Sequence, residues 1–327
     1  MKETPPWQDV PTGTKQAVPL PVCRCADGTQ LMLQFLVARG TSAGPTLLLI
    51  SGVHGDEYEG PAALWQVFQD VDPAAVRGTL VLLPVTNPPA YAAGMRANPN
   101  DAKDLARTFP GSPNGTVTEQ IAHLMQHRVI AHADLFCDFH SAGRYYRIDP
   151  WVGYGMTENS ELLQRQRQAA RVIGYPWVWG TTILPGRTIS AADQCGVPSL
   201  YVEAPGEGRA HSEDVHRNVR AAQQLMRLME MLDEPLEPLE PDEIVEDDRR
   251  DAGYLQIQMV ASHGGFFQPE VTLAGQVEAG QAFGRILDTT GTTLETIPAP
   301  IGGRVVFLRT FPVVSPGDSL GAVMETG

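Results

Sequence analysis

Short apolar runs alternate with helix-like segments over the first two thirds of the chain. Runs bounded by Gly, Pro or polar residues predict strands at 46–51, 78–83, 133–139 and 198–203. Uninterrupted runs of this length are typical of strands buried on both faces of a parallel sheet. Apolar residues that recur every three or four positions predict helices at 60–70, 117–131, 159–173 and 213–232. This alternation predicts an α/β domain with a largely parallel sheet flanked by helices.

The pattern changes in the last third of the chain. Residues 233–251 hold ten acidic residues and three prolines, which predicts a solvated linker. After Gly253, short apolar stretches alternate with Gly and Pro turns, as in a small all-β domain. We therefore predict an α/β domain over 1–240 and a β-rich domain over 241–327.

Composition narrows the classes of partner. The 327 residues include 24 Lys and Arg against 38 Asp and Glu, a net charge of −14. This balance argues against nucleic acid or an anionic membrane as the main partner, since both attract a basic face. No run approaches 18 apolar residues, the length that a membrane-spanning helix needs. Residues 1–13 lack the apolar stretch of a signal peptide. The four cysteines show no C-x-x-C motif. We expect a cytoplasmic protein with reduced thiols.

Metal-binding side chains follow two of the predicted strands. His54 and Glu57 come shortly after 46–51, and His140 directly follows 133–139. Because functional groups gather at the carboxyl ends of parallel strands, the three are expected to converge. Two histidines and a glutamate leave a fourth position of a zinc ion open for water, the pattern of a catalytic site. Asp138 is a candidate to orient an imidazole. The alternative to a metal site is that the two histidines lie in separate, unrelated turns.

Longer motifs extend this picture. In order, the chain contains GVHGDEYEG (52–60), NPPAYAAGMR (87–96), DLARTFPG (104–111) with GTVTEQIA (115–122), and DFHSAG (138–143). Together they resemble the succinylglutamate desuccinylase/aspartoacylase family, which is related to the zinc carboxypeptidases. The resemblance spans about residues 46–208, and the branches containing N-acetyl-diaminobutyrate deacetylase look most similar. It implies a carboxypeptidase-like α/β domain with an appended β-domain, and zinc-dependent hydrolysis of an amide between an acyl group and an amino acid or similar amine.

The resemblance also implies roles for single residues. His54, Glu57 and His140 match the zinc ligands, the same trio that the spacing suggests. Glu203, at the end of the fourth apolar run, matches the catalytic glutamate, which exchanges protons with water and the leaving amine. Glu207, four residues further on, is the competing carboxylate.

Two arginines match groups that contact the substrate. Arg96 matches the arginine that polarises the scissile carbonyl, and Arg107 the one that binds a substrate carboxylate. The family pattern is D-L-N-R, and here Ala106 replaces the asparagine. A methyl group donates no hydrogen bond, so a weaker carboxylate clamp is expected, with Asp104 as an internal partner for Arg107.

The C-terminal domain resembles biotinyl/lipoyl-like barrels, which carry their cofactor on a lysine. Lysine occurs here only at positions 2, 15 and 103, so this domain cannot carry biotin or lipoate. It is expected to shield the active site or to form a surface for homo-oligomers.

The leading prediction is a zinc-dependent deacylase acting on a small acylated substrate, with one zinc ion per chain. A zinc carboxypeptidase that trims peptides is the alternative enzyme. A catalytically inactive protein that binds a small ligand is the alternative from another class, and the residue at 106 leaves room for it.

Overall fold

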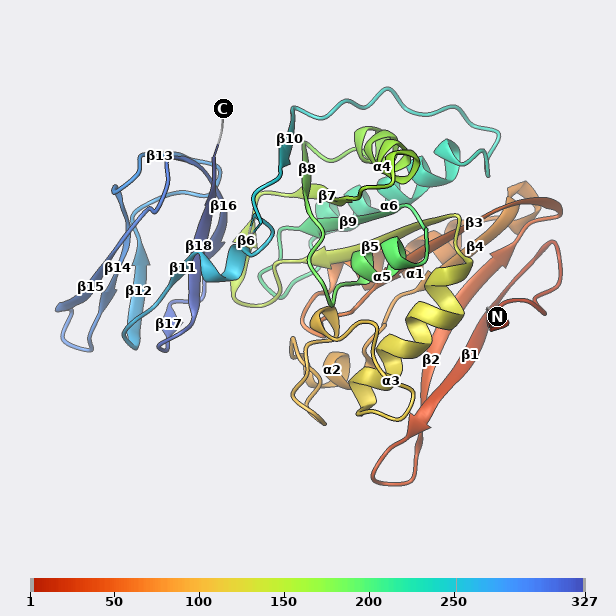
Figure 1. The fold of residues 1–327 in the computed structure, drawn as a ribbon, viewed down its shortest axis with the longest axis horizontal. Coiled ribbons are helices and arrows are strands. Elements are labelled where there is room, and N and C mark those ends of the chain that lie inside the picture. Colours follow the sequence, from red (N-terminus) through yellow and green to blue (C-terminus); the bar gives the residue numbers. More distant parts are fainter. Residues whose placement is uncertain (1–2, 251, 326–327) are drawn as a thin grey trace. The chain divides into compact units, whose positions relative to one another are not determined.

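The computed structural model describes residues 3–250 and 252–325, which form two compact units (Figure 1). The first unit comprises Met1–Ser141, Pro150–Ala204 and Arg209–Arg249. The second comprises Ala142–Asp149, Pro205–Gly208 and Arg250–Gly327. Two short excursions of the chain therefore belong to the C-terminal unit.

A nine-stranded mixed sheet organises the described part of the first unit. Its order is β1-β2-β4-β3-β5-β9-β7-β8-β10, and five of the eight pairings are parallel. The strands are β1 (Thr14–Arg24), β2 (Gln30–Arg39), β3 (Ser42–Ser51), β4 (Arg77–Leu83), β5 (Leu135–Ser141), β7 (Trp151–Met156), β8 (Trp177–Thr182), β9 (Ser199–Ala204) and β10 (Glu243–Asp247). The predicted fold class, an α/β domain with a C-terminal all-β part, is confirmed.

Helices cover both faces of this sheet. They are α1 (Glu59–Asp70), α2 (Pro88–Ala93), α3 (Val117–Leu124), α4 (Ser160–Val172), α5 (Thr188–Gln194) and α6 (Ser212–Leu228). Side chains of α1, α4 and α6 join one apolar core, and those of α3 and α5 join the other. The strands β3, β4 and β5 are buried between the two cores because their apolar runs supply both faces, whereas β9 contributes to the core of α1, α4 and α6.

Short helical turns complete the described part of the first unit. These are η1 (Pro73–Ala75), η2 (Leu105–Arg107), η3 (Met125–Val129) and η4 (Ile130–His132). The segment predicted as one helix over 117–131 is thus α3 followed by the π-turn η3 and the tighter turn η4. Thr116 and Glu119 form the capping box that the sequence predicts at its start.

The sequence prediction missed the amino-terminal hairpin of β1 and β2. The two strands pair antiparallel and extend the sheet beyond β4. Asp27-Gly28 lies at the turn, with Gly28 at φ +83°, and Asp-Gly between alternating apolar residues is a strong hairpin signal.

The acidic segment 233–251 is only partly the linker that its composition predicts. Residues Glu243–Asp247 form β10, which pairs in parallel with β8. Both carboxylate oxygens of Glu246 accept hydrogen bonds from Arg167, at 2.7 Å each. The backbone of this acidic segment extends the sheet at β8, and the side chain of Glu246 also binds Arg167 of α4. A charged segment can therefore form an edge strand, because the pairing uses backbone groups.

The described part of the second unit is all-β apart from the turn η5 (Leu255–Ile257). One sheet has the order β11-β18-β16-β13, with β6 also paired to β16, and the other is β15-β14-β12-β17. Its strands are β6 (Tyr146–Ile148), β11 (Met259–Val260), β12 (Gly265–Pro269), β13 (Gln276–Val277), β14 (Ala282–Leu287), β15 (Thr293–Pro298), β16 (Gly303–Arg309), β17 (Val313–Val314) and β18 (Ser319–Met324). Buried residues of both sheets share one apolar core.

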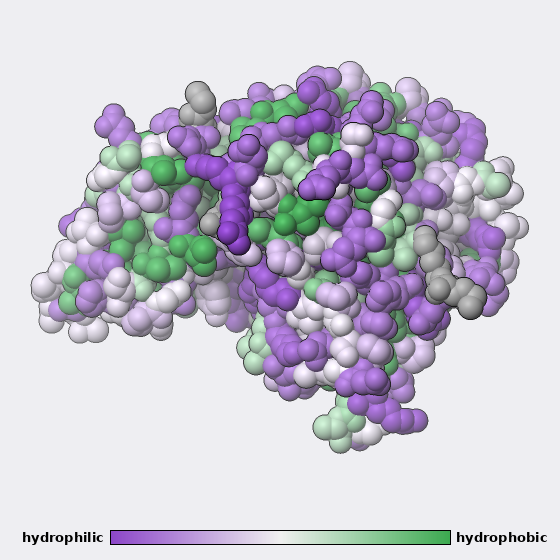
Figure 2. Space-filling view, in the orientation of Figure 1, coloured by the Kyte–Doolittle hydropathy of each residue, from purple (hydrophilic) through white to green (hydrophobic). Residues whose placement is uncertain are grey.

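The boundary expected at 240/241 stays a prediction, and the strand β10 lies just beyond it. The first unit continues to Arg249, since β10 belongs to its sheet. Hydrophobic residues gather in several places over the C-terminal unit in Figure 2. Among its residues, Ile257 is 67% and Val313 is 60% exposed. Whether this unit shields the site or forms an oligomer surface stays a prediction.

In the described residues, no helix is long and apolar enough to cross a bilayer.

Candidate metal centre and active site

The turn between β3 and α1 presents the first two candidate ligands. Gly52 has φ +60°, a left-handed conformation that glycine adopts without strain. Gly55 packs so closely that a Cβ there would lie 2.0 Å from the carbonyl carbon of Ala90. These glycines let the turn fold tightly against α2, which brings His54 and Glu57 to the sheet edge.

His140, on β5, completes a compact group with this turn. The Nδ1 atom of His54 lies 2.7 Å from Oε1 of Glu57, and the Nδ1 atom of His140 lies 3.0 Å from Oε2. One potential ligand atom from each residue lies within 4.8 Å of the others, and all three side chains are buried. The backbone N–H of Ser141 also donates to Oε2 of Glu57, at 3.1 Å.

Each imidazole contacts an aspartate through its second ring nitrogen. Nε2 of His140 is 2.8 Å from Oδ2 of Asp138, and Nε2 of His54 is 3.1 Å from Oδ1 of Asp104. An imidazole that donates from Nε2 keeps the Nδ1 lone pair for a cation. Both histidines therefore have the partners of metal ligands, and the donor set suits a divalent metal ion such as zinc.

Charges within the group shift the pKa values of its members. Burial lowers the pKa of His54 and His140, but nearby carboxylates outweigh it, so the pKa of His54 is raised and that of His140 lies well above its ordinary value. Burial raises the pKa of Glu57, but the two imidazoles lower it by a larger amount. The pKa of Glu57 therefore lies below its ordinary range. A bound cation must displace the protons on the imidazoles, so metal affinity falls as the pH decreases.

Glu203 lies on β9, next to the group. In the register of β5 and β9 it stands opposite His140, so both side chains leave the same face of the sheet. Burial raises the pKa of Glu203 to about 7, and the charge of Glu57 adds to this, against the lowering effects of His140, His54 and Arg96. A half-buried carboxyl with such a pKa can both accept and return a proton near neutral pH.

Arg96 is held beside the same group by Asp104. The Nε atom of Arg96 donates to Oδ2 of Asp104 at 3.1 Å, while Oδ1 of this aspartate contacts His54. Backbone hydrogen bonds from Met95 to Ala90 and from Gly55 to Met95 fix the preceding segment. The Arg96 side chain remains 41% exposed, so its guanidinium is accessible to a substrate.

Asp104 is not primarily the partner of Arg107. Burial raises the pKa of Asp104, but His54, Arg96 and, by a smaller amount, Arg107 together hold it well below its usual range. Arg107 lies in the exposed part of η2, and its Nη1 donates to the carbonyl of Ala106 at 2.8 Å. Ala106 is buried, with its backbone N–H bonded to Oδ1 of Asp104 at 2.9 Å.

Glu207, the competing carboxylate, belongs to the second unit. It has φ +62°, and its Oε2 lies 3.8 Å from Nη1 of Arg147 in the same unit. The pKa of the first-unit carboxylate Glu203 responds to four candidate site residues, whereas Glu207 lies beside an arginine.

Sequence analysis missed two supporting contacts. It did not foresee that Asp104 bridges His54 and Arg96, or that Oγ1 of Thr188 donates to Oδ2 of Asp138 at 2.7 Å. His54 and Asp104, like Asp138 and Thr188, lie 50 positions apart, whereas Arg96 lies 8 positions before Asp104. The D-L-x-R spacing was the available signal for Asp104, and it pointed to Arg107 instead.

A mixed α/β sheet with a buried His₂Glu group, a carboxylate and an arginine at the carboxyl ends of its strands is an arrangement typical of metal-dependent hydrolases. The model of the succinylglutamate desuccinylase/aspartoacylase catalytic domain matches residues 43–229. The chain belongs to this family, as the sequence motifs predict.

Similar proteins extend over nearly the whole chain. The N-alpha-acetyl-L-2,4-diaminobutyric acid deacetylase of Halomonas elongata is 29% identical over 298 residues, covering 89% of this chain and 84% of that protein. The crystal structure of a succinylglutamate desuccinylase/aspartoacylase from Rhodobacter sphaeroides is 27% identical, with a TM-score of 0.84 and 98% coverage of both chains. The product-bound ectoine utilization protein EutE (DoeB) from Ruegeria pomeroyi is 26% identical, with a TM-score of 0.85, covering 97% of this chain and 98% of that one.

Proposed function

We propose that this protein is a zinc-dependent deacylase that hydrolyses the amide bond of a small N-acylated amino acid or amine. Membership of the family and the deacetylase among its relatives support a hydrolase acting on amide bonds. The observation that carries the metal dependence is the buried group of His54, Glu57 and His140, with an aspartate behind each imidazole.

Zinc is the proposed metal because of the donor chemistry. Two imidazole nitrogens and one carboxylate are borderline ligands that suit zinc, and oxygen-only sites would favour magnesium or calcium. When bound, zinc would supply a Lewis acid that lowers the pKa of a coordinated water molecule to about 7.

The chain's own residues would then manage the proton and the charge. We propose that Glu203 takes a proton from the attacking water at a carboxylate oxygen and returns it to the departing amine. Its raised pKa supports both steps near neutral pH. Arg96 would face the carbonyl oxygen of the substrate, where its fixed guanidinium stabilises developing negative charge. Asp104 would hold that guanidinium and the His54 ring in one orientation.

The substrate is proposed to resemble an N-acetylated diaminobutyrate, the compound class in the name of the Halomonas relative. Arg107 is the proposed carboxylate-binding group. Because Ala106 offers no amide donor beside it, the anionic group of the substrate should be more weakly bound or displaced relative to an ordinary α-carboxylate. Four free cysteines support a reducing, cytoplasmic location.

An acyl-release assay tests this proposal. Purified protein would be incubated with N-acetyl and N-succinyl derivatives of amino acids and diamines, with a chelator and after restoration with zinc. We expect turnover of a small acylated amine or amino acid that the chelator removes and zinc restores. Turnover of peptides instead would favour a carboxypeptidase, and chelator-resistant turnover would contradict the metal dependence.

A further inference from the structure

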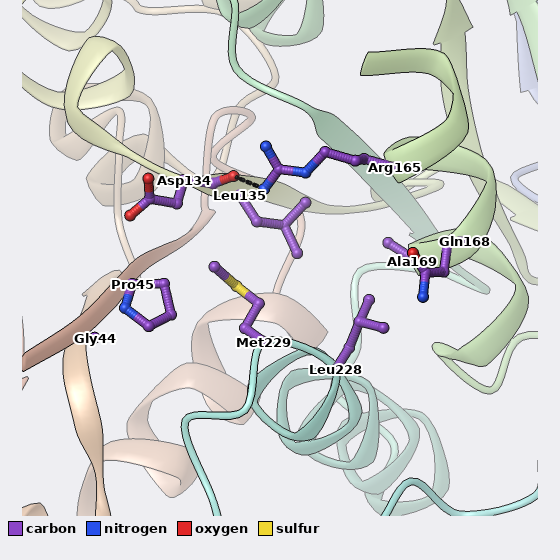
Figure 3. A pocket seen from close by; sticks show the side chains of 9 residues that line it. All are labelled: Gly44, Pro45, Asp134, Leu135, Arg165, Gln168, Ala169, Leu228 and Met229. Carbon is purple, nitrogen blue, oxygen red and sulfur yellow. Dashed lines mark hydrogen bonds between the residues drawn. The ribbon is translucent and has the colours of Figure 1, made fainter. Parts of the chain in front are cut away.

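A pocket lies in the first unit at the amino ends of β3 and β5 (Figure 3). Its volume is about 510 Å³, within the usual range for small-molecule sites. It is lined by the start of β3, by the residues around the start of β5, by α4 and by the end of α6. None of the residues proposed for catalysis lines it.

The inner part of this pocket is apolar. Leu135 of β5 lies at its centre in Figure 3, with Met229 and Leu228 from the end of α6 on one side and Ala169 of α4 on another. Leu135 and Ala169 are buried, so these walls belong to the packed core and are held in place. An apolar side chain of a ligand would lose contact with water against this surface.

The rim carries one positive and one negative side chain. Nη2 of Arg165 donates to the backbone carbonyl of Asp134 at 2.8 Å, which places the guanidinium over Leu135 (Figure 3). Arg165 is exposed, and no carboxylate of the described residues forms an ion pair with it. The Asp134 carboxylate accepts a hydrogen bond from the backbone N–H of Thr46 at 2.7 Å, which fixes its position.

The two charges of the rim differ in sign. The α6 helix ends at Leu228, and the backbone N–H groups of Met229, Glu230 and Met231 already bond the carbonyls of its last turn, so Asp134 supplies the negative charge of the rim. The pocket therefore combines a guanidinium, which suits a carboxylate, with a carboxylate, which suits an ammonium group. A ligand with only one of the two charges would leave one side of the rim without a partner.

From this arrangement we infer that the pocket binds a free α-amino acid with an apolar side chain. The α-carboxylate pairs with Arg165, and the α-ammonium group lies towards Asp134. The side chain enters the apolar part between Leu135 and Met229. This is a second binding site, separate from the catalytic edge.

The distance from the proposed active site follows from the strand. Leu135 lies at one end of β5 and His140 near the other, five residues apart, or about 16 Å at the rise of a strand. Since the amine released by the proposed deacylase could itself be an amino acid, occupancy of the two sites has to be distinguished.

Binding of leucine to the zinc-loaded protein, measured by isothermal titration calorimetry and by ligand-observed NMR, tests the inference. 3-Methylbutylamine and 4-methylpentanoate are compared, because each retains the apolar group but lacks one charge. We expect saturable binding of leucine and at least tenfold weaker binding of the other two. Binding of 4-methylpentanoate as tight as that of leucine would overturn the zwitterion assignment.

Two exposed substitutions locate the site. Arg165→Gln and Asp134→Asn remove one charge each and keep hydrogen-bonding groups, so the fold should persist, as circular dichroism would verify. We expect each to weaken leucine binding at least tenfold, while Arg107→Gln, which removes a guanidinium at the catalytic edge, leaves it within twofold. If Arg107→Gln abolishes binding and Arg165→Gln does not, leucine occupies the proposed active site and the second site is refuted. Leucine at about 20 mM would largely fill even a weak site with a Kd of about 1 mM. The absence of binding at that concentration would also refute the inference, whatever the deacylase assay shows.

Discussion

The two edges of strands β3 and β5 carry charged groups in opposite states. At the carboxyl edge, His54, Glu57 and His140 are buried and contact one another, and their pKa values are shifted. At the amino edge, Arg165 and Asp134 are exposed, and the side chain of each forms a hydrogen bond with a backbone group. Burial makes each charge at the first edge depend on its neighbours, whereas solvent screens those at the second. Substitutions should therefore have large and coupled effects on catalysis at one edge and nearly none at the other.

Removing a ligand should have the largest effect. We expect His54→Ala to lose stoichiometric zinc and to reduce turnover below detection. Only two of the three proposed ligands would remain, and the Glu57 carboxylate would lose a partner. Zinc content by mass spectrometry and initial rates measure this. Wild-type zinc affinity in the variant would exclude His54 from the site.

Asp104→Asn tests whether the charged edge acts as a unit. The amide keeps the size of the side chain but removes the charge that faces both His54 and Arg96. We expect a loss of about 10- to 100-fold in metal affinity or in kcat/KM, as for other carboxylates behind a metal-bound histidine. A zinc titration separates the two. If neither changes more than twofold, Asp104 does not position the site.

Ala106→Asn should sharpen the substrate assignment with a smaller change. One added hydrogen bond to a substrate carboxylate is worth about 1 kcal/mol, or about a fivefold lower KM. The effect should appear for N-acyl amino acids and be absent for their amidated counterparts, which serve as the matched control. Equal changes for both substrate sets would show that position 106 acts through the fold of η2 and not through the carboxylate.

The smallest effect is expected at the opposite edge. Arg165→Gln should leave kcat/KM for the acylated substrate within about twofold of wild type, because this exposed arginine touches no proposed catalytic group. Steady-state kinetics without added amino acids make the comparison. A loss of tenfold or more would mean that the two edges are coupled through β5.

The sequence predicted the central strands because their apolar runs need burial on both faces. It predicted the convergence of His54, Glu57 and His140 because each follows such a strand. It could not place β10, since Glu243–Asp247 contributes backbone hydrogen bonds to β8 that its acidic composition does not reveal. The hairpin of β1 and β2 was accessible from its Asp-Gly turn and was overlooked.

The supporting contacts of the site were harder to predict from the sequence than its proposed metal ligands. Asp104 reaches His54 only because the β3–α1 turn and the segment before η2 fold against each other. Such contacts depend on tertiary packing and leave no periodic pattern. The role of the position next to Arg107 could be proposed from a motif, but the actual partner of Asp104 required coordinates.

The central claim, that Glu203 performs proton transfer beside a bound zinc ion, is tested most directly by Glu203→Gln. Zinc content and the pH dependence of kcat/KM would be measured for this variant and for wild type. The wild type should lose activity as the pH falls through the pKa of Glu203, because the carboxylate must be unprotonated to act as a base. Burial raises that pKa to about 7, and a bound cation lowers it, so the acid limb should lie at or below pH 7. We expect the variant to keep one zinc ion, to lose about two to four orders of magnitude in turnover and to lack this limb. Turnover within a few-fold of wild type, with the acid limb intact, would contradict it.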